Sequence, residues 1–390
     1  MSTHDFTPQT AIVIGASGQD GYFLTERLLA ERWRVHATAR QPDALRTLAA
    51  LPASADNLHL HSFDLIEPSA LFELIARTRP EEIYNLAGQS SVSRSFAEPF
   101  KTWRTNADFV VGLLEHLRLH SPATRFYQAS STDMFGGIAG GTARYDEDAR
   151  LNPQSPYASA KAAAHLLCHF YRQAYNLRIG CGILSNHESH RRPAQFLSRK
   201  ITDHVAALRR LPRAELEKSP PLTMGNLKIR RDWGFAPDYV EGMRLILRQI
   251  SVRSARRNET TQTAHESGDA TTLAPLVDEG RAYRDYVLGT GETHAVWELV
   301  DAAFRLAGFA LEWQLEGEEP SRWLARFRTS GGVAVVVDEK LLRPSDPLVI
   351  QVDPTRARAE LGWSPRAGLE VFLRDMLGET TVRAAHGEQD

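Results

Sequence analysis

The sequence predicts an α/β fold in which a doubly wound parallel sheet is joined to a smaller α/β substrate-binding lobe. Short apolar runs alternate with longer amphipathic ones over residues 1–185, and this alternation loosens after Asn186. A glycine-rich loop directly follows the first apolar run. Strands that alternate with helices in this way form parallel sheets. The chain has 390 residues, more than a single hydrophobic core usually serves, so we expect two lobes.

The elements follow in order along the chain. Strands are predicted at Ala11–Ile14, Arg34–Ala39, Leu58–Phe63, Glu82–Leu86, Arg125–Ala129 and Arg178–Leu184. Apolar residues at three- and four-residue spacing predict helices at Tyr22–Trp33, Leu71–Thr78, Ala107–Leu119 and Ala160–Tyr175. Residues 1–185 should therefore form a Rossmann-like domain, and residues 186–390 mainly the substrate-binding lobe. That lobe should include helices at Val296–Leu306 and around Thr355–Leu361. Residues 251–280 have almost no apolar pattern, which predicts a mobile insertion.

Composition narrows the possible partners and compartments. The formal net charge is −2, which favours neither nucleic acid nor an anionic membrane as a partner. Two cysteines, Cys168 and Cys181, cannot form a disulfide framework and suit a reducing compartment, so we expect a cytoplasmic protein. The N-terminus has no basic-then-apolar export pattern, and no run approaches the ~18 apolar residues of a membrane span.

The loop Gly15-Ala16-Ser17-Gly18-Gln19-Asp20-Gly21 is a candidate phosphate-binding loop. Glycine at its three positions permits a tight turn, close approach of backbone N–H groups to a pyrophosphate, and close packing of helix on strand. The spacing is GxxGxxG and not the GxGxxG of ordinary dinucleotide enzymes. The loop therefore predicts a dinucleotide site, chiefly because it lies between a strand and a helix.

The second and third strands carry the residues that should contact the adenosine half of the cofactor. The second strand ends at Arg40, where an NAD enzyme usually has a carboxylate, and arginine can pair with the 2′-phosphate of NADP. Asp43 lies nearby, and Arg40 could instead be a solvated strand-end charge. Asp64 and Leu65 could contact adenine, although Asp64 could equally be a helix N-cap. NADP is the favoured cofactor.

A candidate catalytic group follows the fifth predicted strand. That strand delivers Ser130, Ser131 and Asp133 at its carboxyl end, where open α/β sheets bind ligands. Tyr157 and Lys161 are four residues apart and so share one face of a helix. A tyrosine acts as a base near neutral pH only if its pKa falls by about three units from ~10, which takes ~4 kcal/mol. The Lys161 ammonium and a cationic nicotinamide could supply this stabilisation.

These motifs resemble the extended short-chain dehydrogenase/reductase superfamily and, within it, the GDP-mannose 4,6-dehydratase family. The resemblance extends over nearly the whole chain. Its matching stretches are Gly15–Gly21, Tyr84–Leu86 with Gln89 and Ser90, Arg125–Ser130, Ser155–Lys161, Asn186–Ser189 with Arg191 and Arg192, Arg199–Thr202, Gly225 and Asn226, Arg231–Gly234, Asp238–Val240, Arg343 and Pro344, and Asp353 and Pro354 with Glu360–Trp363. The stretches from Asn186 to Thr202 and from Arg231 to Val240 are the most specific.

The resemblance implies a set of site residues. Ser131, Asp133, Tyr157 and Lys161 would be catalytic. The cofactor would lie against Gly15, Ser17, Gly18, Gln19, Asp20, Gly21, Arg40, Asp64, Leu65, Leu86, Tyr157 and Lys161, and the sugar nucleotide against Ser90, Asn186, Lys200, Arg231 and Arg343. Arginine and lysine suit a diphosphate, although Arg231 could instead form an ion pair with Asp232.

The implied activity is 4,6-dehydration of GDP-mannose or a close relative, through transient oxidation at C4, elimination across C5 and C6, and hydride return. Asp133 stands where the family has glutamate, one methylene longer, and a misplacement of ~1 Å can cost ~100-fold in rate. Ser91, Ser345 and Asp346 also depart from the family pattern. An NADPH-dependent 4-ketosugar reductase or epimerase therefore stays open, and a cofactor-sensing regulator is a more remote alternative.

Metal chemistry and assembly complete the expectations. His187-Glu188-Ser189-His190 lacks the spacing of a zinc-protease helix, and His59 and His61 have no evident third ligand, so no metal is predicted. The resemblance implies a homodimer formed through Ala107–Leu119 and Ala160–Tyr175. The segment between Arg40 and Asn57 is shorter than the arm that helps build the family's tetramer.

Overall fold

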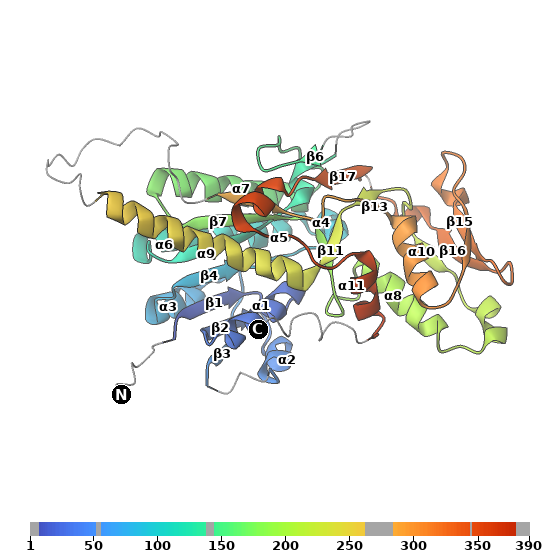
Figure 1. Ribbon diagram of the computed structural model, residues 1–390, viewed down its shortest axis with the longest axis horizontal. Helices are drawn as coiled ribbons and strands as arrows, with labels where there is room; N and C mark the ends of the chain where they lie inside the picture. The colour runs from blue at the N-terminus through green and yellow to red at the C-terminus, as the bar shows by residue number, and fades with distance from the viewer. Residues whose placement is uncertain (1–7, 52–55, 138–143, 262–283, 344, 380–390) are drawn as a thin grey trace.

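A computed structural model describes residues 8–51, 56–137, 144–261, 284–343 and 345–379 (Figure 1). The strands are β1 (Thr10–Ile14), β2 (Arg34–Ala39), β3 (Leu58–Ser62), β4 (Glu82–Asn85), β5 (Arg125–Ser131), β6 (Arg144–Tyr145), β7 (Ile179–Leu184), β8 (Asn186–Glu188), β9 (Leu222–Met224), β10 (Arg230–Arg231), β11 (Trp233–Phe235), β12 (Asp285–Leu288), β13 (His294–Ala295), β14 (Leu311–Gln314), β15 (Leu324–Phe327), β16 (Val333–Val337) and β17 (Val349–Val352). The longer helices are α1 (Gln19–Ala30), α3 (Ser69–Thr78), α6 (Phe109–His120), α7 (Pro156–Tyr175), α8 (Leu197–Leu208), α9 (Ala236–Thr261), α10 (Val296–Leu306) and α11 (Leu369–Met376).

Shorter helical segments connect these elements. The α-helical ones are α2 (Arg46–Ala49), α4 (Val92–Ala97) and α5 (Pro99–Trp103), and π-helical turns lie at Arg104–Asp108 and Ala357–Leu361. The 3₁₀ turns are Pro42–Leu45, Thr132–Phe135, Arg213–Lys218, Pro320–Arg322 and Glu339–Leu341.

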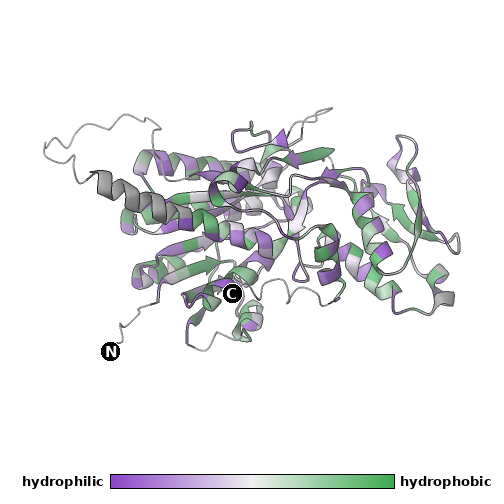
Figure 2. Ribbon diagram, in the orientation of Figure 1, coloured by the Kyte–Doolittle hydropathy of each residue, from purple (hydrophilic) through white to green (hydrophobic). Residues whose placement is uncertain are grey.

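The larger lobe is a seven-stranded parallel sheet with the order β12-β7-β5-β4-β1-β2-β3. Helices α1 and α9 pack on one of its faces, and α3, α6 and α7 pack on the other. Every residue of β1 and β4 is buried, as expected of central parallel strands covered on both sides. Figure 2 shows mainly hydrophobic colours along the sheet and mixed colours on the helices around it. The predicted doubly wound parallel sheet is confirmed.

The second half of the chain contributes to both lobes. Tyr239, Met243 and Leu247 of α9 pack into the core with α1, and β12 pairs in parallel with β7 at the sheet edge. The sheet thus draws on residues beyond 185, so the larger lobe is not one continuous stretch of sequence. Residues 251–261, predicted to begin a mobile insertion, instead continue α9, and 262–283 lie outside the described residues.

The smaller lobe has its own core beneath the four-stranded sheet β14-β15-β16-β9, where α8, α10 and α11 pack. Two small sheets, β13-β10-β17-β6 and β11-β8, lie where the lobes meet. The helix predicted at Val296–Leu306 has those bounds, and the one near Thr355–Leu361 ends in a π-helical turn at Ala357–Leu361. Within the described part of the chain, no helix is long and apolar enough to cross a membrane.

Candidate active site

The phosphate loop closes tightly between β1 and α1. Gly15 has a φ of +87°, and a Cβ there would lie 2.9 Å from the backbone of Ala87. At Gly21 a Cβ would lie 2.3 Å from the carbonyl oxygen of Gly15, so only glycine allows this approach of helix to loop. Gly18 is the N-cap of α1 and offers no side chain to its first turn. The backbone N–H groups of that turn have no intrahelical acceptor, and a dinucleotide pyrophosphate fits such a cradle.

The side chains of Gln19 and Asp20 turn toward the protein. Gln19 Nε2 donates a hydrogen bond to the carbonyl oxygen of His187 at 2.9 Å. Asp20 Oδ2 lies 2.9 Å from His187 Nε2. Both were expected to contact the cofactor. In the structure their side chains contact His187 of β8, while their backbone N–H groups lie in the first turn of α1.

The residues expected at the adenosine half lie along the carboxyl edge of β2, β3 and β4. Arg40 is exposed directly after β2. Asp43 lies in the following 3₁₀ turn, where it pairs with Arg46 at 2.8 Å. Asp64 Oδ1 accepts a hydrogen bond from the N–H of Ile66, so it stabilises a turn. The N-cap interpretation of Asp64 is wrong, because α3 begins only at Ser69.

Two apolar residues from the same prediction remain partly accessible beside that edge. Leu65 packs against the core under α3 and α6, and Leu86 packs against the core under α1. The N–H of Leu86 donates to the carbonyl oxygen of Ile14, which holds the end of β4 beside the phosphate loop. Leu86 is therefore close to the cradle in space, because β4 pairs with β1 in the sheet.

The catalytic side chains converge from β5 and α7. Ser131 ends β5, and its Oγ accepts a hydrogen bond from the N–H of Asp133 at 3.2 Å. Helix α7 starts one residue before the tyrosine, because Ser155 caps it and Pro156 occupies its first position. Tyr157 is buried and hydrogen bonds with Ser131. The carboxyl end of β5, which carries Ser131, and the start of α7, which carries Tyr157, thus lie together as expected.

The protonation of this group differs from the expectation. Burial raises the pKa of Tyr157 well above its usual value, and the Asp133 carboxyl adds to that rise while the Ser131 hydrogen bond opposes it. Burial lowers the pKa of Lys161 to about 8. Lys161 Nζ donates to the carbonyl oxygen of Ala129 at 3.0 Å and lies 6.0 Å from the centre of the Tyr157 ring. The lysine therefore does not by itself lower the tyrosine pKa.

Asp133 faces a cluster of charges from the lobe junction. Burial raises its pKa, and the nearby guanidinium groups of Arg231 and Arg343 oppose this. Arg231 is buried on β10 and donates to Asp346 Oδ1 at 2.8 Å, so its ion-pair partner is Asp346 and not Asp232, the partner considered as an alternative. Arg343 lies 3.6 Å from Asp346. The structure thus joins the predicted acid to two of the predicted diphosphate-binding arginines.

The other predicted substrate contacts are more dispersed. Asn186 opens β8 and pairs in register with Trp233 of β11, beside the arginine of β10. Ser90 is exposed in the loop after β4. Lys200 lies on α8, where Nζ donates to the carbonyl oxygen of Thr223 at 2.6 Å. The described contacts of Lys200 are thus made within the smaller lobe.

Sequence reasoning missed three contributors to the site. Asp346 was noted only as a departure from a family pattern, yet it holds Arg231. Arg192 pairs with Glu188 at 3.0 Å and lowers the pKa of Tyr157. His187 was considered only as a metal ligand, and it instead binds the phosphate loop. The family stretch from Asn186 to Arg192 was the available signal, although it did not show which residues these side chains contact.

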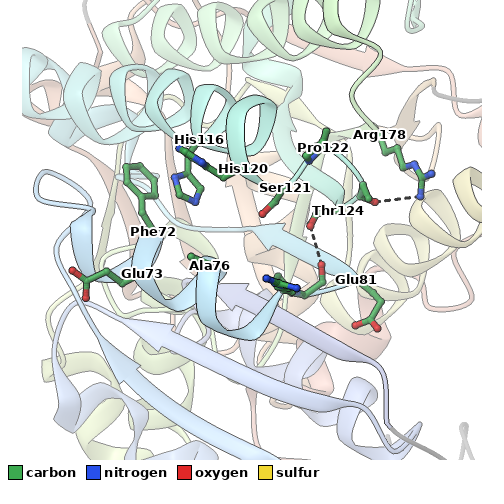
Figure 3. Close-up of a pocket in the computed structure, with 13 residues that line it drawn as sticks. Phe72, Glu73, Ala76, Glu81, His116, His120, Ser121, Pro122, Thr124 and Arg178 are labelled. Carbon is green, nitrogen blue, oxygen red and sulfur yellow. Dashed lines mark hydrogen bonds between the residues drawn. The ribbon is translucent and has the colours of Figure 1, made fainter.

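A separate open hollow of about 900 Å³ lies at the amino ends of the central strands, opposite to the ends that carry the catalytic group (Figure 3). Its wall includes Glu81 and Thr124, which precede β4 and β5, and the ring of His116, stacked on Phe72 at 4.5 Å. Tyr157 and Ser131 lie beyond the carboxyl ends of these strands. The hollow is therefore distinct from the catalytic group.

Comparison with known proteins gives one consistent result. The sequence model of the family described as GDP-mannose 4,6 dehydratase matches residues 12–274 and 268–376. The chain is 34% identical over 380 residues to GDP-mannose 4,6 dehydratase 1 of Arabidopsis thaliana, covering 95% of this chain and 89% of that protein. It is 33% identical over 376 residues to the GDP-mannose 4,6 dehydratase of Homo sapiens, covering 94% and 90%.

Solved structures show the same fold at lower identity. The dTDP-glucose 4,6-dehydratase of Streptomyces venezuelae, with NAD and TYD bound, has a TM-score of 0.69 at 20% identity, covering 95% of this chain and 98% of that one. RMD from Pseudomonas aeruginosa, complexed with NADPH, has a TM-score of 0.64 at 19% identity, with the same two coverages.

Proposed function

The chain belongs to the GDP-mannose 4,6-dehydratase family, and from this membership we propose that it is a nucleotide-sugar 4,6-dehydratase acting on GDP-mannose or a close relative. One observation carries the proposal: the carboxyl of Asp133 lies in the same buried charge cluster as Tyr157 and Arg231. A dehydratase needs this arrangement, because oxidation at C4 and elimination at C5 and C6 occur on one sugar.

Three side chains act on the oxidation step. Tyr157 takes the proton of the sugar 4-hydroxyl, and Ser131 holds the same oxygen through its hydroxyl. A bound nicotinamide supplies reversible storage of the hydride from C4. Lys161 completes the site as the buried cation beside Tyr157, and its pKa of about 8 leaves it mostly charged at neutral pH. The raised pKa of Tyr157 means that the phenol is neutral until further positive charge is close to it.

Asp133 carries the elimination. Its carboxylate takes the proton from C5, which the C4 ketone makes acidic, and the resulting carboxylic acid donates a proton to the departing 6-hydroxyl as water. A carboxyl with a raised pKa suits both halves of this transfer, because it accepts a proton more readily than an ordinary carboxylate and then passes that proton on. Arg231 and Arg343 bind the diphosphate through charge-assisted hydrogen bonds.

The test is product analysis with matched variants. Wild-type protein incubated with GDP-mannose and a trace of NADP⁺ should yield a 4-keto product lighter by one water, with no net cofactor consumption. Asp133→Asn should lose about 10²–10⁴ in dehydration rate and accumulate enzyme-bound reduced nicotinamide. Asp43→Asn, an exposed carboxyl paired with Arg46, is the control and should retain the wild-type rate.

The result that overturns the proposal is equally definite. Wild-type protein that dehydrates no nucleotide sugar, yet consumes NADPH on a 4-keto sugar or epimerises a substrate, would be the reductase or epimerase. Asp133→Glu adds information in that case, because the restored methylene should then permit elimination.

NADP is the proposed cofactor. Arg40 is exposed at the end of β2, where it can reach a 2′-phosphate, and the nearby carboxylate of Asp43 is already paired with Arg46. This pairing removes the main reason to favour NAD. The two free cysteines, both buried, support a cytoplasmic location.

A homodimer is the proposed assembly. Helices α6 and α7 pack together and expose large apolar side chains, including Leu119 at 56%, Leu166 at 57% and Phe170 at 50%. A helix pair that exposes such residues needs a partner surface, and a second copy offers the same apolar face. The short segment after Arg40 makes a tetramer a secondary possibility.

A further inference from the structure

Helix α7 carries a buried polar stripe that begins at the catalytic lysine. Its members are spaced by four, three and four residues, which places them on one face of the helix: Lys161, His165, Cys168 and Arg172. None of the four exposes more than 8% of its surface. Lysine and arginine are almost never fully buried unless they are paired. The partners of this stripe therefore show what it does.

The far end of the stripe is an ion pair with the edge strand β12. Arg172 donates to both carboxylate oxygens of Asp285, each at 2.7 Å. Burial would raise the pKa of Asp285, yet Arg172 outweighs it and the pKa falls to about 2, so the carboxylate is ionised. His165 Nε2 lies 3.7 Å from Asp285 Oδ2, and Cys181 of β7 contacts the same ring. The stripe thus ties α7 to β7 and β12.

The near end of the stripe contacts the last residues of β5. Ser130 Oγ lies 2.9 Å from His165 Nδ1, and both side chains are buried. The Asp285 carboxylate only accepts hydrogen bonds, so the His165 Nε2 that faces it carries a proton. The serine hydroxyl can donate or accept, so it bonds with Nδ1 whether the imidazole is neutral or charged.

This part of β5 has a neighbouring strand on one side only. β4 ends opposite Gln128, where Asn85 is its register partner, whereas pairing with β7 continues through Ser131. An open strand edge leaves backbone groups that other partners must satisfy. The carbonyl oxygen of Ala129 accepts from Lys161 Nζ at 3.0 Å and from Gln128 Nε2 at 2.9 Å. Side chains therefore hold the end of β5 where β4 no longer does.

Ser130 lies between the two β5 residues that contact the catalytic tyrosine and lysine. Ser131 hydrogen bonds with Tyr157. The carbonyl group of Ala129, which accepts from Lys161, and the N–H of Ser130 belong to one planar peptide unit. A shift of Ser130 must therefore move the acceptor of the lysine. His165 holds Ser130 from a position one helical turn beyond Lys161.

We propose that His165 is a positioning residue for the Tyr157–Lys161 pair, because its hydrogen bond to Ser130 fixes the peptide unit that receives the Lys161 ammonium. The imidazole acts through Ser130 and β5, and not on the reacting atoms. Its effect on turnover rests on the proposed function. Its effect on the charge of Lys161 needs no substrate, and this difference separates the two claims.

The charge of Lys161 can be titrated directly, because the sequence has only six lysines. Full-length protein labelled with ¹³C-lysine is followed by NMR as the pH is raised, and Lys161→Arg assigns the resonance. Burial lowers the pKa of Lys161, opposed by Cys168 and Asp20, and wild-type protein should titrate near pH 8. His165→Phe keeps a ring but neither nitrogen. It should lower the Lys161 titration by about one pH unit, since a weaker hydrogen bond to the charged form disfavours that form.

Turnover of GDP-mannose is the second measurement. In His165→Phe, kcat should fall by about 10–100-fold with KM unchanged, because a misplacement of ~1 Å at the reacting groups can cost about 100-fold. His165→Gln should restore most of the rate and of the titration, since its amide can still bond with the serine hydroxyl. Ser130→Ala should reproduce the loss with a much smaller change in volume, which provides a second route if His165→Phe does not fold. The double variant should lose no more than either single one.

A histidine at the other end of the strands supplies the control. His116 lines the hollow at the amino ends of the central strands, so His116→Gln should change neither the Lys161 titration nor the rate. A purely structural role for His165 would lower the unfolding temperature without moving the Lys161 titration.

Two results overturn the role of His165. One is a wild-type Lys161 titration in folded His165→Phe and Ser130→Ala, whatever their rates. The other is a shifted titration that leaves the turnover of an active enzyme unchanged. If wild-type protein turns over no nucleotide sugar, the proposed function fails, and the lysine titration still decides whether His165 positions Lys161.

Discussion

Alanine at Gly21 should damage the phosphate loop far more than alanine at Gly18. A Cβ at Gly21 would lie 2.3 Å from the Gly15 carbonyl oxygen and 2.6 Å from the Ala16 Cα, whereas at Gly18 the nearest atom lies at 3.3 Å. Carbon atoms pack at about 3.5–4.0 Å, so the Gly21 substitution must move loop or helix by about 1 Å. Gly18→Ala requires a shift of only a few tenths of an ångström.

The expected magnitudes follow from these overlaps. Overpacking of this kind costs about 1–3 kcal/mol, so Gly21→Ala should lower the unfolding temperature by several degrees and abolish measurable cofactor binding. Gly18→Ala should keep the wild-type unfolding temperature and still weaken cofactor binding, because its new methyl group stands where the pyrophosphate approaches. Gly368→Ala, with nothing within 4 Å of its Cβ, should change neither quantity.

Thermal unfolding and cofactor titration of the three variants test whether this loop is the cofactor cradle. The interpretation of this loop as a cofactor cradle is refuted if Gly21→Ala retains both wild-type stability and wild-type cofactor affinity. It is also refuted if Gly18→Ala binds NADP⁺ as tightly as wild-type protein does.

Four further predictions test other parts of the molecule. Tyr157→Phe should abolish turnover and leave cofactor affinity nearly intact, since only the proton-transferring oxygen is lost. Rate and binding assays measure both quantities, and substantial activity of the variant would contradict the assigned role. Arg40→Ala should remove most of the preference for NADP over NAD in affinity measurements, and tighter NAD binding by wild-type protein would overturn the assignment. Burial lowers the pKa of His36 to about 4, so between pH 4 and 6.5 the folded protein binds fewer protons there than the unfolded chain. Stability should therefore fall as the pH drops below 6.5, by up to about 2 kcal/mol at pH 5 from this group, and His36→Phe should flatten that decline in denaturant titrations. Phe170→Asp should shift light-scattering mass toward the monomer, and a stable wild-type monomer at micromolar concentration would rule out the proposed dimer.

The larger lobe was predictable because its signals are local. β1 is almost entirely apolar, as expected of a strand buried on both faces, and the predicted bounds of β1, β2 and β4 agree with the structure to within one residue. The end of α9 was not predictable in this way. Residues 251–261 are rich in arginine, serine and threonine and have almost no apolar pattern, yet the helix that begins at Ala236 continues through them. Composition predicts whether a segment has an apolar pattern, and a helix can continue beyond the part that has one.

In the candidate site, too, local features were predictable from the sequence and long-range contacts were not. Tyr157 and Lys161 are one helical turn apart, and Ser131 and Asp133 share one turn, so spacing alone placed each pair. The contacts that set their charges connect distant parts of the chain. Arg231 meets Asp346 across 115 residues. Sequence periodicity does not indicate a contact over such a separation, and the alternative pairing of Arg231 with the neighbouring residue Asp232 was wrong.

The ion pair between the phosphate loop and β8 is a second contact between distant parts of the chain. His187 lies 167 residues from Asp20, and the sequence offered only the negative result that its spacing to His190 excludes a zinc-protease motif. Because both ring nitrogens face acceptors, the structure requires a charged imidazole, and that charge requires the carboxylate of the phosphate loop. The side chain of Asp20, a loop residue expected to touch the cofactor, thus contacts the substrate-side strand, while its backbone N–H stays in the first turn of α1.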